Sequence, residues 1–383
     1  MSGHHEAYVI NILDGMAARG IKPIVATDIN LATSNSVKRI RCAHPSVHFI
    51  FSKPPDEISL YGSAYKDARR EFAYWRWFKQ TYEHSLESIS VNRVLLPYID
   101  YALYAIGMLG SPFRHCEFSG IAMRPTFHHR EEGVHTPYRR SDFIKEALFG
   151  RLLKCPNLRH LLTIDDTLFR FAQKKGAAQW SKVKLIHDPT TIDSVEYKPP
   201  YLVSELATRT IPVLLVYGAI EARKGIKELL DAALVLHNTS ECPTIVIAGR
   251  QGDEAAKIIN DDKYISLKLS KKLIELNEFI SSDLESQLLM NCDAVWMGYK
   301  AHYGMSGVII KAAAAKRQII ATKDGLIGWH AAHLHRSSLV DVNDIGAICL
   351  SLRAITMHPF SNFDQDLLFK YSWENANNLI LGH

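Results

Sequence analysis

The chain has 383 residues, of which 47% are apolar, and a formal net charge of +5 with a pI near 8.7. This length allows two domains with separate cores, and the weak positive charge excludes the dense basic surface of a nucleic-acid-binding protein. The six cysteines form no Cys-x-x-Cys pair, and no apolar run reaches transmembrane length. We therefore expect a soluble cytoplasmic protein with reduced thiols. A location at the inner face of the membrane stays open.

Apolar runs alternate with helical patterns along the chain, which predicts parallel sheets in an α/β protein. Strands are expected at 22–27, 47–51, 93–97, 119–123, 161–164, 183–186, 213–217, 244–249, 265–268, 294–298 and 318–322, and helices of the first half at 6–19, 61–86, 100–109, 141–153 and 166–174. A stretch without periodicity, punctuated by Asp188-Pro189 and Pro199-Pro200, predicts the linker. We therefore expect Rossmann-like domains at 1–195 and 196–365, and a C-terminal helix at 366–383 that packs back on the first domain.

The segment 61–82 combines aromatic residues, among them Tyr74, Trp75 and Trp77, with five cations. Aromatic side chains beside cations are typical of peripheral membrane contact, as for an enzyme with a lipid-linked acceptor. A helix wedged between a sheet and a neighbouring helix, with arginine stems covering apolar surface, explains the same composition. The sequence leaves both interpretations open.

Polar residues follow two predicted strands of the first half. Tyr98 and Asp100 come after the third strand, at the lip of the crevice expected at the strand ends, although a helix N-cap is the favoured explanation of Asp100. Arg124 and His128 come after the next strand, in a polar loop at the same edge of the sheet. We name Arg124 and His128 as crevice candidates, the alternative being a loop held by its own hydrogen bonds.

Two turns of the second half combine glycine with groups that suit a phosphate. Arg223 and Lys224 stand where a loop meets a helix, and an arginine fork with a lysine point charge can clamp a diphosphate. Further on, Gly304-Met305-Ser306-Gly307 opens an alanine-rich helix, whose first N–H groups and dipole favour an anion. A solvated helix start and tight helix packing explain each turn singly, but the combination favours a phosphate site.

Together, the strand 213–217, the Arg-Lys-Gly junction and the Gly-Met-Ser-Gly helix resemble the donor half of a GT-B glycosyltransferase of the family-4-type retaining enzymes, and the resemblance covers nearly the whole chain. It implies an α/β fold of two Rossmann-like domains facing each other across a cleft. It also implies transfer of a sugar from a nucleoside diphosphate sugar to a hydroxyl of a glycan or lipid-linked acceptor, with retention and without a further cofactor.

The resemblance also assigns roles to individual residues. The donor diphosphate is expected on Gly3, Arg223, Lys224, Met305, Ser306 and Gly307, the catalytic candidates are Arg124 and His128, and the acceptor side or cleft is expected to include His4, Tyr98 and Asp100. Disorder or helix capping is an alternative explanation of the N-terminal histidines.

Three features depart from the family pattern. The carboxylates of the family's Glu-x7-Glu motif are replaced by Tyr303 and Lys311, and the family's Gly-Arg pair is Gly218-Ala219. A lysine cannot accept hydrogen bonds from ribose hydroxyls, because an ammonium has donors only. Only Met1 stands where the family has an apolar strand before its first helix: either the start is truncated or misassigned, or the sheet lacks its first strand, and the last two cases put the donor geometry in doubt. A non-catalytic GT-B relative, which binds a nucleotide or a partner subunit, therefore stays as the alternative.

No metal ion is expected. The adjacent pairs Asp165-Asp166 and Asp261-Asp262 are interpreted as a cap and a turn. The three histidines at 330, 333 and 335 lack a nearby carboxylate or cysteine motif and are assigned to packing or to the surface. The expected mechanism is thus metal-independent.

Overall fold

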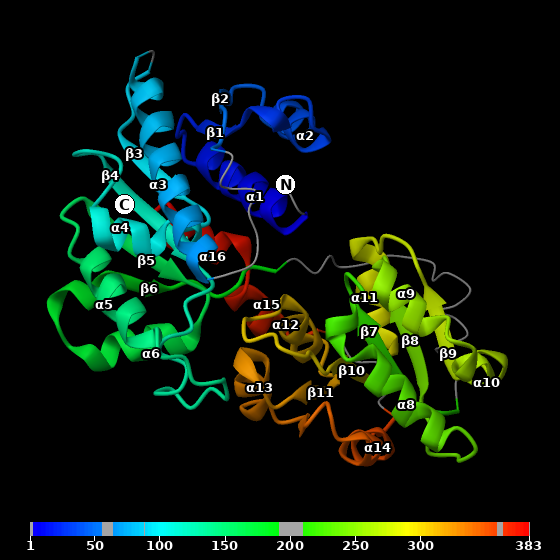
Figure 1. The fold of residues 1–383 in the computed structure, drawn as a ribbon. Helices are drawn as coiled ribbons and strands as arrows, with labels where there is room; N and C mark the ends of the chain where they lie inside the picture. Colours follow the sequence, from blue (N-terminus) through cyan, green and yellow to red (C-terminus); the bar gives the residue numbers. More distant parts are fainter. Residues whose placement is uncertain (1–2, 56–63, 88, 191–209, 358–362, 383) are drawn as a thin grey trace. The chain divides into compact units, whose positions relative to one another are not determined.

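A computed structural model describes residues 3–55, 64–87, 89–190, 210–357 and 363–382, without the side chains of 3–5 and 64–67 (Figure 1). The chain divides into two compact units. Unit 1 comprises 1–132, 138–188 and 373–383, and unit 2 comprises 133–137 and 189–372. The predicted domain boundary at 195 lies outside the described residues and stays a prediction.

Unit 1 alternates helices with short strands. Its helices are α1 (Gly3–Ala18), α2 (Asn35–Ala43), α3 (Ala64–Leu86), α4 (Leu103–Leu109), α5 (Asp142–Leu153), α6 (Asp166–Lys175) and α16 (Trp373–Ile380). Its strands are β1 (Ile24–Asp28), β2 (His48–Ser52), β3 (Arg93–Leu96), β4 (Glu117–Ala122), β5 (Leu158–Thr163) and β6 (Val183–Leu185).

The strands of unit 1 form two separate parallel sheets. Strands β3 to β6 are neighbours in sequence order, with Leu96 opposite Gly120 and Leu161 opposite Val183. Strands β1 and β2 pair only with each other among the described residues. An apolar core formed by α3, α4, α5 and α6 covers one face of the four-stranded sheet. Side chains that follow β3, β4 and β5 therefore meet at one edge of this sheet.

The aromatic side chains of α3 are used for packing within unit 1. The Tyr74 ring stacks on the Tyr101 ring with 4.7 Å between centroids. The indole Nε1 of Trp75 donates to the carbonyl of Gly110 at 2.8 Å, and that of Trp77 donates to Ser52 Oγ at 2.8 Å. These contacts bear out the packed-helix interpretation for the three side chains. Within the described segments, no helix combines the length and the apolar character needed to cross a membrane.

The predicted C-terminal helix is two helices, α15 (Gln365–Lys370) in unit 2 and α16 in unit 1. The Trp373 ring packs edge-on against Tyr8 of α1, with centroids 4.7 Å apart. The Asn377 amide donates to the carbonyl of Asn11 at 2.9 Å. Helices α1 and α16 thus pack together within unit 1.

Unit 2 has one six-stranded parallel sheet. Its strands are β7 (Val213–Tyr217), β8 (Thr244–Ala248), β9 (Leu273–Leu276), β10 (Ala294–Met297), β11 (Gln318–Thr322) and β12 (Ser337–Val340). Besides α15, its helices are α8 (Ile226–Leu236), α9 (Asp253–Ile259), α10 (Ile265–Leu269), α11 (Ser282–Asn291), α12 (Gly307–Ala314), α13 (Gly325–Ala332) and α14 (Ile345–Arg353).

The strand order of this sheet is β12-β11-β10-β7-β8-β9. Alternate residues enter two cores: Leu214 and Val216 pack with α8, α9 and α14, whereas Val213 and Leu215 pack with α11, α12 and α13. From β7 the chain continues to β8 and β9 on one side, and it later returns to β10 on the other. The order therefore reverses between β7 and β10, where ligands of open α/β sheets bind at the carboxyl ends of the strands.

One strand prediction is wrong. Residues 265–268 belong to helix α10, because buried Tyr264 and Leu267 lie three residues apart while Ile265 and Leu269 are 57% and 80% exposed. A short apolar run does not distinguish a strand from a helix turn. The strand of this region is β9, which was not predicted; β12 and α2 were also missed.

Candidate functional site

The loops after β7 and β10 meet at the reversal point of the unit 2 sheet. Gly225 has a φ of 68°, and a Cβ there would lie 2.3 Å from the carbonyl oxygen of Gly298. The backbone N–H of Lys300 donates to the carbonyl of Arg223 at 2.7 Å, and Trp296 Nε1 donates to that of Lys224 at 2.8 Å. These contacts hold the two loops together, and the first contact requires glycine.

Two cations lie on this junction in different environments. The Arg223 side chain is 44% exposed and pairs with Glu221 at 2.8 Å, whereas Lys224 is only 4% exposed and its Nζ donates to the carbonyl of Tyr217. Both cations lie over the Tyr299 ring, at 5.7 Å and 5.3 Å from its centroid. Arg223 is therefore accessible to an anion, while Lys224 holds the end of β7.

His302 connects the two predicted phosphate turns. Its Nε2 lies 3.3 Å from the carbonyl of Met305, and its Nδ1 lies 3.4 Å from Arg223 Nη1. Burial, together with the charges of Arg223 and Lys224, lowers the pKa of His302. A neutral ring that donates from Nε2 and accepts at Nδ1 satisfies both contacts. His302 thereby brings Arg223 next to the N-terminal turn of α12.

The N-terminus of α12 has the form that the sequence predicted. Ser306 is the N-cap in extended conformation, its side chain makes no capping hydrogen bond, and Gly307 is the first helical residue. The Ser306 hydroxyl and the first amides of this eight-residue helix form the second donor set beside Arg223.

Lys311, where the family motif has its second glutamate, is engaged in an ion pair. Its Nζ donates to both carboxylate oxygens of Glu285 on α11, at 2.7 Å and 2.8 Å. The side chains are 19% and 8% exposed, and Tyr217 hydrogen-bonds to the same carboxylate. The carbonyl of Tyr303, the other motif position, accepts from Leu326 N at 3.1 Å. The pair neutralises the lysine charge inside unit 2.

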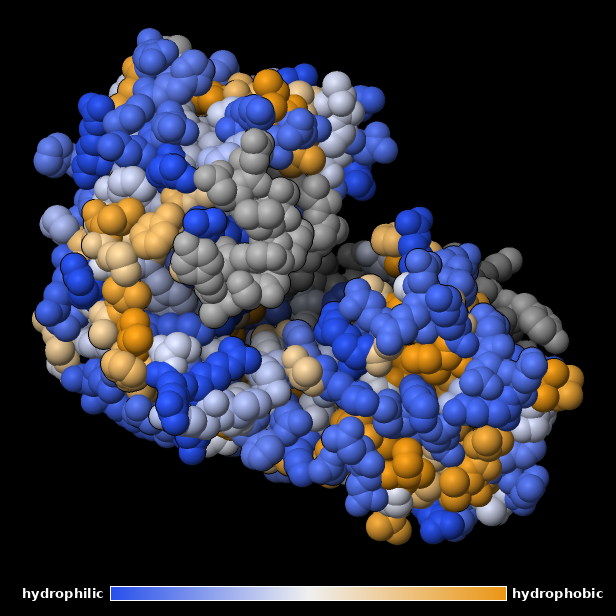
Figure 2. Space-filling model, viewed as in Figure 1, coloured by the Kyte–Doolittle hydropathy of each residue, from blue (hydrophilic) through white to orange (hydrophobic). Residues whose placement is uncertain are grey.

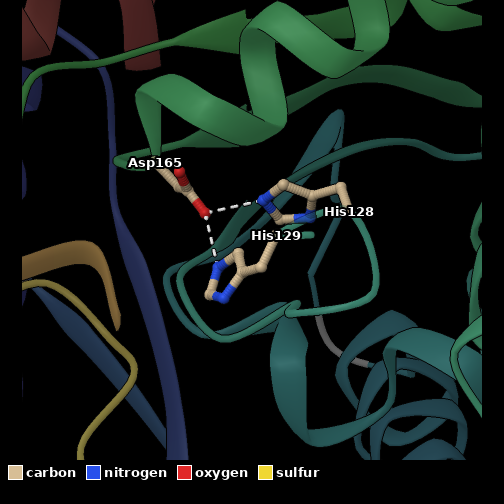
Figure 3. Close-up of side chains that lie close together, drawn as sticks. All are labelled: His128, His129 and Asp165. Atoms are coloured by element: carbon tan, nitrogen blue, oxygen red, sulfur yellow. Dashed lines mark hydrogen bonds and ion pairs between the residues drawn. The ribbon is translucent and has the colours of Figure 1, made fainter. Parts of the chain in front are cut away.

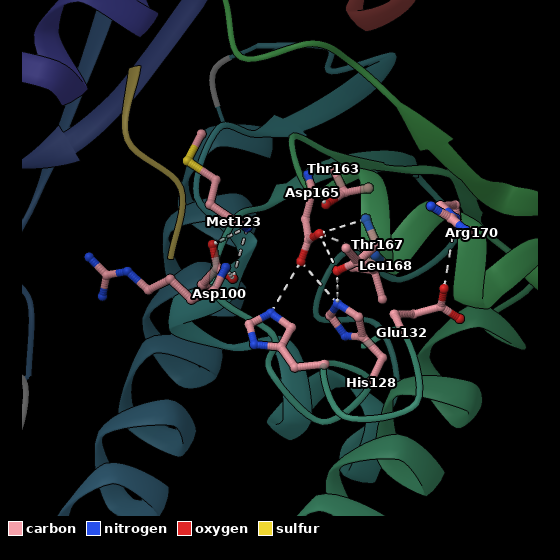
Figure 4. Close-up of polar contacts among 11 residues, drawn as sticks. Asp100, Met123, His128, Glu132, Thr163, Asp165, Thr167, Leu168 and Arg170 are labelled. Atoms are coloured by element: carbon pink, nitrogen blue, oxygen red, sulfur yellow. Dashed lines mark hydrogen bonds and ion pairs between the residues drawn. The ribbon is translucent and has the colours of Figure 1, made fainter. Parts of the chain in front are cut away.

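Three predicted residues meet at the edge of the four-stranded sheet of unit 1. The Asp100 carboxylate accepts from the backbone N–H of Met123 at 3.0 Å and from that of Arg124 at 2.9 Å (Figure 4). The cap interpretation of Asp100 is therefore wrong: the short helix at 99–101 has Tyr98 as its N-cap, and α4 begins at Leu103. The Arg124 side chain is exposed and lies 5.7 Å from the centroid of the Tyr101 ring. Asp100 thus fixes the backbone that presents Arg124.

His128 lies in a second, buried contact set (Figures 3 and 4). Its Nε2 is 2.9 Å from Asp165 Oδ2, and Nε2 of His129 is 3.4 Å from the same oxygen. All three side chains are at most 1% exposed. Asp165 is also the predicted cap, now confirmed, because its Oδ1 accepts from Thr167 N at 2.8 Å and Leu168 N at 3.3 Å. One carboxylate therefore ties the loop after β4 to the start of α6.

The pKa shifts in this contact set follow from its burial. Burial lowers the pKa of His128, against the opposing effect of Asp165. The pKa of Asp165 is lowered too: burial alone would raise it, but the hydrogen bond from His128 and the nearby His129 ring outweigh that effect. A charged carboxylate that accepts from a neutral His128 ring accounts for both directions.

The same three side chains are the only group of at least three metal-ligating residues within the described part of the chain, with ligand atoms within 4.8 Å of one another. A ligating histidine normally donates its second ring N–H to an acceptor. Nδ1 of both His128 and His129 is buried without a hydrogen-bond partner, and so is Nε2 of His129. The donor set therefore fits a hydrogen-bonded clamp better than a metal centre. Asp364 and Asp366 form an Asp-x-Asp sequence, in which Asp364 is the N-cap of α15.

The predicted site residues thus fall into two groups, one in each unit. Arg223, Met305 and Ser306 are brought together through His302, and Tyr98, Asp100 and Arg124 lie on one sheet edge. His128 is completely buried, so its predicted catalytic role stays a prediction. Helix α1 begins at Gly3, and the side chain of His4 lies outside the described residues. The predicted roles of Gly3 at the diphosphate and of His4 in the cleft also stay predictions. Sequence reasoning missed Tyr299, His302, His129 and Glu285. The first three come after strand ends, which was a usable signal, whereas Glu285 lies within helix α11.

No family profile and no curated protein sequence matches the chain. Solved structures do. Sucrose-phosphate synthase from Thermosynechococcus elongatus is 13% identical, with a TM-score of 0.60 over 98% of this chain and 88% of that chain. Anabaena Alr3699/HepE, solved in complex with UDP, is 16% identical, with a TM-score of 0.58 over 99% of this chain and 95% of that chain.

A glycosyltransferase from Rickettsia africae is 15% identical, with a TM-score of 0.53 over 99% of this chain and 90% of that chain. At such identities the likeness concerns the fold. It extends over both units, and it agrees with the parallel sheets and the strand order described above. The chain therefore has the GT-B fold of glycosyltransferases.

Proposed function

We propose that the chain is a glycosyltransferase, which moves a sugar from a nucleoside diphosphate sugar to a hydroxyl of a glycan or lipid-linked acceptor. The observation that carries the proposal is the junction of Arg223 with the N-terminus of α12 at the reversal point of the unit 2 sheet. Structures with this fold, solved with UDP and with UDP-glucose, support a nucleotide sugar as the donor.

The chemistry follows from the charge that develops during transfer. The leaving diphosphate gains negative charge as the sugar acquires oxocarbenium character, so groups that hold the diphosphate stabilise the transition state selectively. Arg223 supplies a fork of N–H donors, and the Ser306 hydroxyl and first amides of α12 supply neutral donors. These groups can perform this task without a metal ion. Retention of configuration and membrane contact belong to the proposal through the family resemblance and the acceptor class.

In unit 1, Arg124 is the residue that we assign to the substrate side. It is exposed, and its backbone is held by Asp100 at the carboxyl edge of the sheet. We assign His128 a positioning role in place of direct contact with substrate, because it is buried against Asp165.

A non-catalytic GT-B relative is the second candidate function, and one observation favours it. Lys311 is held by Glu285 through two short contacts, so the position that binds ribose in the resembling family is closed by an internal ion pair. A nucleotide would have to find its ribose acceptors elsewhere in unit 2.

The test is calorimetric titration of the full chain with UDP-, GDP-, dTDP- and ADP-glucose, in the presence of EDTA and again with Mg²⁺. We expect one donor to bind equally well in both conditions, and Arg223→Ala to weaken it by about tenfold or more, because charged hydrogen bonds contribute about 1.5–3 kcal/mol each. Arg353→Ala is the matched control, since Arg353 is 45% exposed and also pairs with a glutamate, at 2.9 Å. Lys224 is left intact because it holds β7.

Binding followed by transfer to an added acceptor would support the enzyme, and binding without any turnover would favour the second candidate. A folded chain that binds none of the four donors would refute the donor site.

A further inference from the structure

An arginine lies over two stacked phenyl rings on the small β1–β2 sheet of unit 1. The rings of Phe49 and Phe51, both on β2, are nearly parallel, with 5.7 Å between centroids and 7° between planes. The guanidinium of Arg41, on α2, lies 5.2 Å from the centroid of Phe49 and 5.8 Å from that of Phe51. The rings are partly buried, whereas Arg41 is exposed. They therefore hold the cation in place while its outer side faces solvent.

Two exposed lysines continue this row of side chains. Alternate residues of a strand point to the same face, so Lys53, which directly follows β2, comes next in line after Phe49 and Phe51. Lys38 precedes Arg41 by three positions, which places both on one side of α2. Figure 2 shows hydrophilic residues with a few apolar ones between them over the part of unit 1 where Figure 1 draws α2 and β2. We call these five side chains the α2–β2 surface.

The segment that carries this surface contains no carboxylate. Residues 29–55 include two lysines and two arginines, but neither aspartate nor glutamate. Two nearby carboxylates are engaged elsewhere: Glu6 of α1 pairs with Arg39 at 2.8 Å, and Asp28 accepts from the backbone N–H two residues further on at 2.8 Å. Within the described part of the chain, the three cations of the α2–β2 surface form no ion pair. Their positive charge is therefore uncompensated.

Lys263 of unit 2 shows the contrast. Its ammonium also lies over an aromatic ring, 4.6 Å from the centroid of Tyr264. It is paired, however, with the carboxylate of Asp231 at 2.9 Å. The charge of Lys263 is thus neutralised within the chain, whereas that of Arg41 is available to an anion from outside.

We infer that the α2–β2 surface binds an acidic glycan, separately from the groups assigned to the donor and to transfer. Arg41 presents its planar fork of N–H donors to a carboxylate of the glycan, and Lys38 and Lys53 attract neighbouring carboxylates as point charges. This second binding surface goes beyond the proposed function. The choice of a glycan over other polyanions rests on that function, but binding at this surface requires no donor and is measured without one.

Single-stranded nucleic acid is the competing ligand, and the arrangement of the rings argues against it. Bases bind such proteins mainly by stacking on open aromatic faces. Here the Phe49 and Phe51 rings are stacked on each other and lie beneath the guanidinium. The net charge of +5 over 383 residues is also far from that of a nucleic-acid-binding protein. The surface therefore offers charge to a ligand, with little ring face for a base.

The experiment is calorimetric titration of the full chain, without a donor, with polygalacturonate, with neutral dextran and with a thymidine oligonucleotide. We expect polygalacturonate alone to bind, and its binding to weaken as salt is added. Arg41→Gln should weaken the binding about fivefold, the upper range for one exposed ion pair, and replacement of all three cations by glutamine about a hundredfold. Arg41→Lys, which keeps the charge but not the fork, should recover only part of the loss.

Lys263→Gln is the matched control, because it removes a cation from an aromatic ring where Asp231 already neutralises the charge, and it should leave the binding unchanged. Unchanged binding in Arg41→Gln, equal weakening in the control, or tighter binding of the oligonucleotide than of polygalacturonate would overturn the inference. A chain that binds a nucleotide sugar but not polygalacturonate would overturn it and leave the proposed function intact. Binding of polygalacturonate by a chain that binds no donor would support this surface and refute only the donor site.

Discussion

Replacing Asp165 by asparagine removes the charge on which the buried clamp of unit 1 depends. In the wild-type chain the carboxylate accepts from the His128 ring through Oδ2, which also lies 3.4 Å from Nε2 of His129, and it accepts from Thr167 and Leu168 through Oδ1. Asparagine can keep the capping contacts, because its side-chain oxygen is also a good N-cap acceptor. Its NH₂ group would instead face the two imidazole nitrogens, so at least one ring must change its tautomer or lose its partner.

The expected cost is set by two opposing effects. A hydrogen bond to a charged group contributes about 1.5–3 kcal/mol; this applies to the His128 bond, and the longer His129 contact adds a smaller attraction. The 2.9 Å contact of His128 should count more than the 3.4 Å contact of His129. A neutral amide is less costly to bury than a carboxylate, which offsets part of the lost stability. We therefore expect unit 1 to be destabilised by about 2–4 kcal/mol.

Amide hydrogen exchange near neutral pH measures this effect within one molecule. Amides of β4 and β5 that exchange only through unfolding of unit 1 should exchange about 30- to 900-fold faster in the variant, which is the conversion of about 2–4 kcal/mol at 1.36 kcal/mol per factor of ten. Amides of β7 and β8 in unit 2 serve as the internal reference.

Asp344→Asn is the matched control for this variant. Asp344 caps α14 by accepting from Ala347 N at 3.0 Å, is exposed, and has no histidine on its carboxylate. It should have little effect, because asparagine caps as well as aspartate. A change below about tenfold in the Asp165→Asn variant, or an equal change in both units, would refute the clamp.

Three further outcomes are expected. Burial raises the pKa of Glu71 from 4.5 to about 7. The stability that Glu71 contributes is therefore fully present below pH 4.5 and is lost as the pH rises through 7, so the melting temperature should decline over this range. Glu71→Gln should flatten the decline, and an unchanged pH profile of the melting temperature would contradict the shift. Gly225→Ala should lower the melting temperature more than Gly20→Ala, since both glycines have a positive φ but only Gly225 would clash; equal losses would argue against the loop contact. Elemental analysis of the untagged chain should find no stoichiometric metal. One zinc per chain that is lost in His129→Ala would instead show that His128, His129 and Asp165 form a metal centre.

The strands that sequence reasoning found and missed differ in burial. Four of the unit 2 strands, β7, β8, β10 and β11, lie inside the sheet, are buried almost throughout, and appear as uninterrupted apolar runs. The edge strands β9 and β12 are each four residues long and only partly buried, so they lack this signal. The apolar run at 265–268 forms a helix turn instead, because Tyr264 and Leu267, three residues apart, face the core while Ile265 is exposed.

The candidate site was predictable in position but not in the division of tasks. Arg223 and Lys224 are equivalent in the sequence, yet one is accessible and the other holds the end of β7. Asp100 and Asp165 both follow strands, yet only Asp165 caps a helix. These differences depend on which backbone groups neighbouring strands bring within reach, and a linear pattern does not contain that information.

The separation of the two contact sets by unit makes binding and transfer separable. The donor groups around Arg223 and α12 lie wholly in unit 2, while Asp100, Arg124 and the His128 clamp lie wholly in unit 1. A substitution that loosens the Arg124 backbone, such as Asp100→Asn, should therefore leave the donor affinity unchanged and reduce turnover. A substitution at Arg223 should reduce both. If Asp100→Asn weakened donor binding as much as Arg223→Ala does, donor binding would depend on the Arg124 loop as well, and the division of donor binding and turnover between Arg223 and that loop would be wrong.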